Sequence, residues 1–221
     1  ENDSQIGGVG LEILMDENEH LYINEPDVLD GTADFDNNTF CWNDSTGAAH
    51  VTIPGGTAGT PPYTFLWSNT WPVIGGQKTQ LADSLWAGLH SCLVTDDAGC
   101  EFTTPDVLIE SPPVIGVSVT NTPPTCHSSV TFKTGPVAYS ADGELTVEPS
   151  GGTPGGVGVD EYDYQWFAAD GIGGTPGTVL QTDLGLVTST LSGLVGNANY
   201  FCLITDANLC DTLHEMTLLE P

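Results

Sequence analysis

The residues best able to do chemistry in this 221-residue chain are its six cysteines, which fall three to a repeat. No Cys-x-x-Cys pair occurs, so a zinc site has little support. A cysteine that recurs in each repeat is more consistent with a structural role than with that of a catalytic nucleophile. The pattern favours an oxidising compartment and a framework of disulfide bonds. The matching positions are Cys41 and Cys126, Cys92 and Cys202, and Cys100 and Cys210.

Oxygen-rich side chains offer a second kind of chemistry, the binding of a hard cation. Asp34, Asp36 and Asn38 alternate in an acidic lead-in, as the first ligands of an EF-hand do, so calcium is the cofactor they would hold. The glycine and the distal glutamate of that motif are absent, and the competing interpretation is a solvated turn. Apart from calcium, no cofactor is expected.

Paired carboxylates suggest a glycosidase, since two acids that flank a glycosidic bond can hydrolyse it. With 30 Asp and Glu residues such pairs arise by chance, so we predict that the chain is not an enzyme. Trp71 and Trp86 lie outside the expected core, and exposed aromatic rings can stack on sugars. They would be the carbohydrate contacts of a binding module, and packing against a sheet edge or a neighbouring repeat is the alternative.

The charge balance limits the partners. The chain has two basic residues, both lysine, and a net charge of −28. Nucleic acid and anionic membrane surfaces are bound through Lys and Arg, so neither is an expected partner. No apolar run is long enough to cross a membrane, so membrane insertion is not expected either.

The sequence indicates a tandem array of similar repeats. Residues 88–112 and 196–221 share two strands around a tight Val/Ile-Thr-Asp turn, and both end in a short acid–proline exit. Three segments are predicted: 1–26, a partial repeat or a strand-donating segment; 27–112, a full repeat; and 113–221, a repeat with longer loops. The extra length of the third segment falls in 128–142, 153–161 and 168–185, which we expect to be surface loops.

The hydrophobic pattern has the period of strands. In 48–53, Ala49, Val51 and Ile53 share one face while the residues between them share the other. About seven short strands per repeat, with Trp67 or Trp166 at the centre, predict tandem immunoglobulin-like (PKD-like) β-sandwich domains of the all-β class.

The ordered motifs resemble the SprB repeat, which builds long cell-surface adhesins of gliding and related Bacteroidetes bacteria. The first copy carries Cys41, Gly47, Gly55, Gly56, Thr57, Pro62, Tyr63, Phe65, Trp67, Ser68, Leu85, Gly88, Val94, Thr95, Asp96, Gly99 and Cys100. The second keeps Cys126, Gly143, Gly151, Gly152, Thr153, Tyr164, Trp166, Leu194, Gly196, Ile204, Thr205, Asp206 and Cys210. The resemblance covers nearly everything after residue 26. Leu209 departs from it in place of the turn glycine, and His90 in place of a tyrosine.

The resemblance implies a disulfide within each repeat, Cys41–Cys100 and Cys126–Cys210. An immunoglobulin-like bridge within each repeat is the alternative. It would join Cys41 to Cys92 and Cys126 to Cys202. Cys92 and Cys202 are additional to the usual pair of the family, and they would be buried core thiols under the first scheme.

The resemblance also implies export by the type IX route, display on the bacterial cell surface and no enzymatic activity. Ser45, Ser84 and Thr212 follow aspartates in sequences similar to the O-glycosylation motif of exported Bacteroidetes proteins, so they are candidate glycan sites. We expect a structural or adhesive extracellular repeat protein that forms a fibre or adhesin stalk. Its partners would be copies of itself, neighbouring repeats or surface glycans, and the alternative function is a carbohydrate-binding module.

Overall fold

The computed structural model describes residues 13–15, 21–23, 28–54, 59–68, 77–125, 141–156, 160–170 and 175–220. Every regular element within these ranges is a β-strand, so the all-β class is confirmed. The chain divides into two compact units. The first comprises Glu1–Thr39 and Asn43–Ser111, and the second comprises Phe40–Trp42 and Pro112–Pro221. The segment 40–42, which we placed in the first repeat, therefore groups with the second unit.

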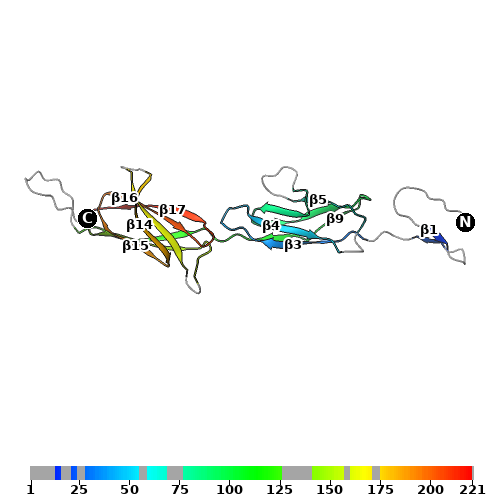
Figure 1. The fold of residues 1–221 in the computed structure, drawn as a ribbon, viewed down its shortest axis with the longest axis horizontal. Helices are drawn as coiled ribbons and strands as arrows, with labels where there is room; N and C mark the ends of the chain where they lie inside the picture. The colour runs from blue at the N-terminus through cyan, green and yellow to red at the C-terminus, as the bar shows by residue number, and fades with distance from the viewer. Residues whose placement is uncertain are drawn as a thin grey trace, which may run out of the picture. The chain divides into compact units, whose positions relative to one another are not determined.

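The described residues of the first unit form two three-stranded sheets and two two-stranded sheets, all antiparallel. One sheet has the order β3-β4-β6 and the other β5-β8-β9, while β7 pairs with β10 and β1 with β2. Figure 1 shows β3 and β4 in one layer and β5 and β9 in the other. The strands are β1 (Ile13–Met15), β2 (Leu21–Ile23), β3 (Thr32–Asn37), β4 (Gly47–Thr52), β5 (Thr64–Trp67), β6 (Leu81–Leu85), β7 (Gly88–His90), β8 (Cys92–Thr95), β9 (Glu101–Thr103) and β10 (Val107–Ile109).

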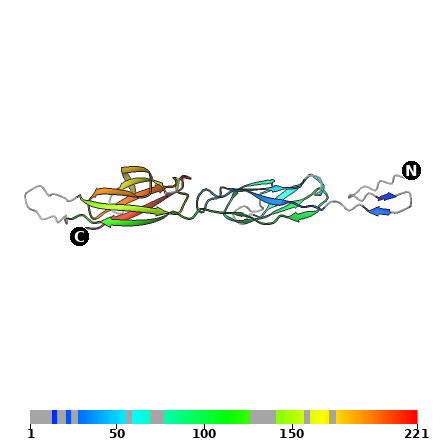
Figure 2. The same cartoon turned by 90° about the horizontal axis from the view of Figure 1, so that it is seen from below.

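The second unit is a sandwich of a three-stranded sheet, β11-β12-β15, and a four-stranded sheet, β14-β13-β16-β17. In Figure 2 the strands of this unit run across the view. This is the immunoglobulin-like arrangement that the sequence predicts. The strands are β11 (Gly116–Thr122), β12 (Gly143–Ser150), β13 (Tyr162–Ala169), β14 (Pro176–Leu186), β15 (Ser189–Leu194), β16 (Ala198–Thr205) and β17 (Asp211–Leu218).

The core of each unit lies between its sheets and is built by alternation. Ala49 and Val51 of β4 are fully buried, while Ala48 and His50, which alternate with them, are half-buried, as the period-two pattern predicts. Trp67 and Trp166 are 1% and 0% exposed and sit at the centre of the two cores. Each Trp pairs across its sheet with a buried cysteine, Cys92 or Cys202.

Two elements differ from the sequence prediction. The segment 168–185 was expected to be a surface loop, yet β14 forms an eleven-residue edge strand against β13, with several register shifts. Conversely, the second of the two strands expected in residues 88–112 is divided in the structure. Its first part, β9, ends at Thr103, and its second part, β10, begins at Val107. Pro105 lies in the gap, where it offers no N–H to a ladder. In the second unit, the corresponding β17 is continuous.

No helix in the described part of the chain is long and apolar enough to cross a membrane.

Candidate functional site

The one disulfide among the described residues joins Cys41 to Cys210, with their Cα atoms 5.6 Å apart. Both pairing schemes from the sequence are therefore wrong for these two cysteines. Cys100 is a free, exposed thiol, and Cys92 and Cys202 are free and buried. Cys126 lies outside the described residues. The physical reason is the path of the chain: after β3, residues 40–42 run with the second unit, which brings Cys41 to the β16–β17 turn.

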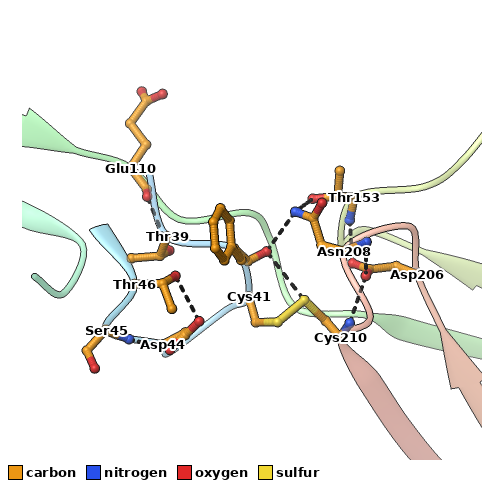
Figure 3. The surroundings of a disulfide bond; sticks show 11 residues. Thr39, Cys41, Asp44, Ser45, Thr46, Glu110, Thr153, Asp206, Asn208 and Cys210 are labelled. Carbon is orange, nitrogen blue, oxygen red and sulfur yellow. Dashed lines mark hydrogen bonds between the residues drawn. A yellow bond between two sulfur atoms is a disulfide. The ribbon is translucent and has the colours of Figure 1, made fainter. Parts of the chain in front are cut away.

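The β16–β17 turn is held by the buried carboxylate of Asp206, which is 4% exposed. The amides of Asn208 and Cys210 both donate to its Oδ1 at 2.9 Å, and the amide of Thr153 donates to Oδ2 at 2.7 Å. Figure 3 shows this cluster beside the disulfide. A carboxylate that accepts three backbone N–H groups fixes both the turn and the loop that carries Thr153. The position of Cys210 is set by this network.

The segment 40–42 is held on this turn by contacts besides the disulfide. The side-chain amide of Asn208 donates to the carbonyl oxygen of Phe40 at 3.0 Å, and the Cys210 Sγ lies 3.3 Å from the same oxygen. A pocket of about 400 Å³ surrounds the bridge. Its lining residues are Cys41, Trp42, Pro113, Val114, Ile115, Gly152, Asp206, Leu209, Cys210, Asp211 and Thr212.

The first unit repeats the same turn, and among its described residues no disulfide is attached to it. The Asp96 carboxylate accepts from the amides of Cys100 at 2.7 Å and Thr60 at 3.0 Å, and it is 7% exposed. The hydrogen bond from the Thr60 amide, more than any other, holds the pKa of Asp96 below its usual range. The two turns are thus structural equivalents, with Cys100 in the place of Cys210.

This equivalence corrects the alignment of the glycines. In the order of the repeat motifs, Gly55-Gly56 corresponds to Gly151-Gly152. In the structure, however, Gly59 is the residue that approaches Asp96 as Gly152 approaches Asp206. An added Cβ would lie 2.8 Å from the Asp96 Oδ2 at Gly59 and 2.7 Å from the Asp206 Oδ2 at Gly152, and both residues have positive φ. Only glycine fits such a position without strain. Gly55 and Gly56 lie outside the described residues.

The two buried thiols are poor candidates for reactivity. Burial raises the pKa of the Cys92 thiol to about 11 and that of the Cys202 thiol to about 12. The thiolate is the nucleophile and the metal ligand, so at neutral pH these two cysteines act as small core residues beside the tryptophans. The role of buried core thiols, expected from the family resemblance, agrees with these surroundings.

The three residues expected to hold calcium lie in or beside strand β3 rather than in a turn. The Asp34 carboxylate accepts from the Thr32 hydroxyl at 2.9 Å, and the hydroxyls of Thr52 and Thr32 hold its pKa below the usual range. The Asp36 carboxylate lies 2.9 Å from His50 Nδ1. The Asn38 oxygen accepts from the Glu110 amide at 2.8 Å. No group of three His, Cys, Asp or Glu side chains that could hold a metal occurs among the described residues. Calcium binding at this strand stays a prediction.

The remaining candidate residues are scattered. Trp71 lies outside the described residues, and Trp86 is half-buried, with its carbonyl oxygen 2.9 Å from His90 Nε2. Ser84 is exposed on β6 with positive φ, while Ser45 and Thr212 are half-buried. Glycan attachment and sugar stacking at these positions stay predictions.

Sequence reasoning missed the Asp206 network, Asn208 and the role of the segment 40–42. One signal in the sequence bears on the pairing of the cysteines without identifying the partners. Each repeat holds three cysteines, and an odd number cannot be fully paired inside one repeat. One cysteine in each repeat is therefore free to pair with a cysteine of another repeat, as Cys41 does.

Comparisons with known proteins add no family. No protein-family model matches the sequence, and no curated protein does. Solved structures with some similarity include an amphioxus IgVJ-C2 molecule, at 7% identity over 88% of this chain and 98% of that one, with a TM-score of 0.27. Extracellular domains 3–5 of Drosophila OTK show 15% identity over 91% and 64% of the two chains, with a TM-score of 0.28. Chicken CNTN1 domains FN1–FN3 show 10% identity over 91% and 68%, with a TM-score of 0.28. Scores this low carry no argument, so the fold assignment rests on the sheet topology itself.

Proposed function

We propose that this chain is a pair of extracellular, non-catalytic β-sandwich modules that serve as structural repeats of a bacterial surface fibre or adhesin stalk. The observation that carries the proposal is the Cys41–Cys210 disulfide of the second unit, which joins two cysteines that lie 169 residues apart in the sequence. Disulfides persist in oxidising surroundings outside the cytoplasm. A covalent bridge within a module suits a chain that must stay folded under load.

The composition supports the same role. A net charge of −28 keeps neighbouring fibres apart and soluble, and it works against binding of nucleic acid or anionic lipid. The exit from the first repeat ends in Pro112 and Pro113, whose rings fix φ and bias the residue before each to extended geometry. The resemblance to SprB repeats supports the cell-surface location, and copies of the chain or neighbouring repeats are the proposed partners.

The exposed ring of Trp42 is the observation that favours the alternative of carbohydrate binding. The side chain is 59% exposed and lines the pocket beside Cys41 and Asp211. Aromatic faces next to carboxylates and hydroxyls are suited to sugar rings. The pocket has a volume of about 400 Å³, and both cysteines of the disulfide line it. We therefore assign a structural role to this part of the surface first and carbohydrate binding second.

Electron microscopy of the native material, with image reconstruction, tests the proposed function. We expect filaments in which β-sandwich modules repeat at regular spacing, since tandem modules joined end to end form quasi-one-dimensional arrays. A sample treated with a reducing agent is the control, and it should show filaments that are shorter or less regular. Isolated monomers that bind a glycan array saturably, with binding lost in Trp42→Ala, would replace the stalk assignment with the carbohydrate-binding alternative.

A further inference from the structure

The pocket beside the Cys41–Cys210 disulfide has an exposed apolar rim. Leu209, Trp42 and Val114 line the pocket, and their exposed fractions are 81%, 59% and 57%. All three residues belong to the second unit. Large apolar side chains that are exposed singly are common, whereas several around one hollow form a patch that marks an interaction site. The volume of about 400 Å³ is in the range of sites that take up one small molecule or one side chain.

Leu209 is the member of this rim that the fold itself explains least. Its φ is 64°, in the left-handed region, and its amide donates to the Asp206 carbonyl oxygen at 3.1 Å. The equivalent residue of the first unit is Gly99, whose φ is 85° and whose amide donates to the Asp96 carbonyl oxygen at 3.1 Å. Glycine adopts this conformation without steric cost, and leucine does not. A solvent-exposed leucine at this position therefore indicates a contact made by its side chain outside the fold.

The charged side chains that line the pocket are both acidic. Asp211 is exposed, so its carboxylate is open to a ligand. Asp206 is 4% exposed, and the backbone amides that donate to its carboxylate carry no net charge, so its negative charge remains in the pocket wall. Among the described residues that line the pocket, none is Lys, Arg, His, Asn or Gln. A ligand that brings several N–H donors, a positive charge and no acceptor matches this wall.

We propose that this pocket binds the arginine side chain of a partner protein. A guanidinium group is flat, stacks on an aromatic ring such as that of Trp42 and donates N–H groups to a carboxylate such as that of Asp211. Its aliphatic stem would lie along the apolar rim. A free amino acid carries its own carboxylate, which the two aspartates of the pocket repel, so the favoured source is a side chain within a polypeptide. The net charge of −28 attracts a basic partner over longer range.

A carbohydrate would use the same pocket but would make different demands on it. Every sugar hydroxyl both donates and accepts, so a sugar site needs side chains of both kinds. The donors among the described lining side chains are the Thr212 hydroxyl and the Trp42 indole N–H, and they stand beside two carboxylates. This excess of acceptors favours a ligand that only donates, as arginine does.

The experiment is a titration of the ¹⁵N-labelled full chain with N-acetyl-arginine amide, followed by NMR at the indole N–H of Trp42. That signal is the one missing from the spectrum of Trp42→Ala. The control ligand is N-acetyl-citrulline amide, which has the same stem and a neutral end group. We expect saturable shifts with the arginine compound and binding about tenfold weaker with the citrulline compound, the factor that a partly desolvated cation–aromatic contact supplies. Equal binding of the two compounds would overturn the proposal.

Leu209→Gly separates a role in binding from a role in folding. Because glycine suits the left-handed turn, the unfolding transition of the second unit should stay in place or move to higher temperature. Binding of N-acetyl-arginine amide should nevertheless weaken several-fold, because the stem loses an apolar contact. Unchanged binding in this variant would contradict the proposed site.

Asp211→Asn tests the carboxylate, and it should weaken binding of the arginine compound about tenfold, because a charged hydrogen-bond acceptor is lost. The matched control is Glu101→Gln. Glu101 is exposed, follows Cys100 in the equivalent turn of the first unit, and carries the same charge. The titrations are run at about 0.15 M salt, where the screening length is roughly 8 Å, so Glu101→Gln should bind like the wild-type chain. An equal loss in both variants would trace the attraction to net charge alone and overturn the proposal.

Two further ligands distinguish the possible occupants. Free arginine should bind more weakly than the capped compound, and tighter binding of free arginine would show a site for an amino acid instead of a protein side chain. Methyl glycosides of common hexoses should leave the Trp42 signal in place. A shift with a glycoside and none with the arginine compound would replace the proposal by carbohydrate binding. None of these readouts involves filaments, so failure of the arginine site and failure of the stalk function are separate results.

Discussion

Replacing Cys41 and Cys210 together by serine is expected to lower the free energy of unfolding of the second unit by about 4–5 kcal/mol in the chain-entropy account. The bridge spans a sequence separation of 169 residues, and so long a closed loop strongly restricts the unfolded chain. The double variant is the cleaner choice, because either single change leaves a thiol that is free to exchange. Calorimetry or guanidinium unfolding, followed by the transition of the second unit, measures the effect.

The matched control for that experiment is Cys100→Ser, which changes a cysteine at the equivalent turn of the first unit. Since Cys100 is exposed and free, its replacement should change stability by less than about 0.5 kcal/mol. Reduced wild-type protein should unfold like the double variant. If the double variant and the Cys100→Ser control unfolded alike, the bridge would have no part in holding the second unit.

Trp166→Ala is expected to cost the second unit about 3–5 kcal/mol, the range for truncating a large buried aromatic side chain. The side chain is 0% exposed, and its indole Nε1 donates to the Ser189 hydroxyl at 2.8 Å. Truncation leaves a cavity between the sheets and removes a hydrogen bond from Ser189, which is itself 1% exposed. The transition of the first unit should not move.

Two further tryptophans provide the controls for this prediction. Trp67→Ala should produce the mirror result, because Trp67 is 1% exposed in the core of the first unit and donates its indole N–H to the Thr79 carbonyl at 3.0 Å. Trp42→Ala, at a side chain that is 59% exposed, should change either transition by less than about 0.5 kcal/mol. Differential scanning calorimetry resolves the two transitions. A Trp166→Ala protein in which both transitions fell equally would mean that the units do not have separate cores.

The sandwich fold could be predicted because its signals are local or repeated. The alternation in β4 fixes which face is buried, and the Trp at the end of β5 recurs in β13. Gly47 and Gly143 recur for a physical reason. An added Cβ at either residue would lie within 3.0 Å of a neighbouring strand: of the Leu85 carbonyl oxygen at Gly47, and of the Leu194 carbonyl oxygen at Gly143. Such positions are the same in every copy of the fold, so repetition in the sequence reveals them.

The disulfide partner could not be predicted, because it depends on where a short segment runs after its strand ends. No pattern in the sequence around Cys41 indicates that residues 40–42 group with the second unit. Both family analogy and the immunoglobulin pattern assume that a bridge stays inside its repeat. The edge strand β14 was missed for a related reason. Its sequence is rich in Gly and Pro and predicts a loop, and only its pairing with β13 establishes it as a strand.

The most direct test of the account is a disulfide map of the native, non-reduced protein. Exposed thiols are first alkylated, and an endoproteinase that cleaves before aspartate then releases each of the six cysteines in its own peptide. The account predicts a linked pair of peptides 36–43 and 206–210, which carry Cys41 and Cys210. The buried Cys92 and Cys202 should stay unalkylated until the protein is denatured. A link from 36–43 to 97–105, which carries Cys100, would place the bridge inside the first repeat and contradict the account.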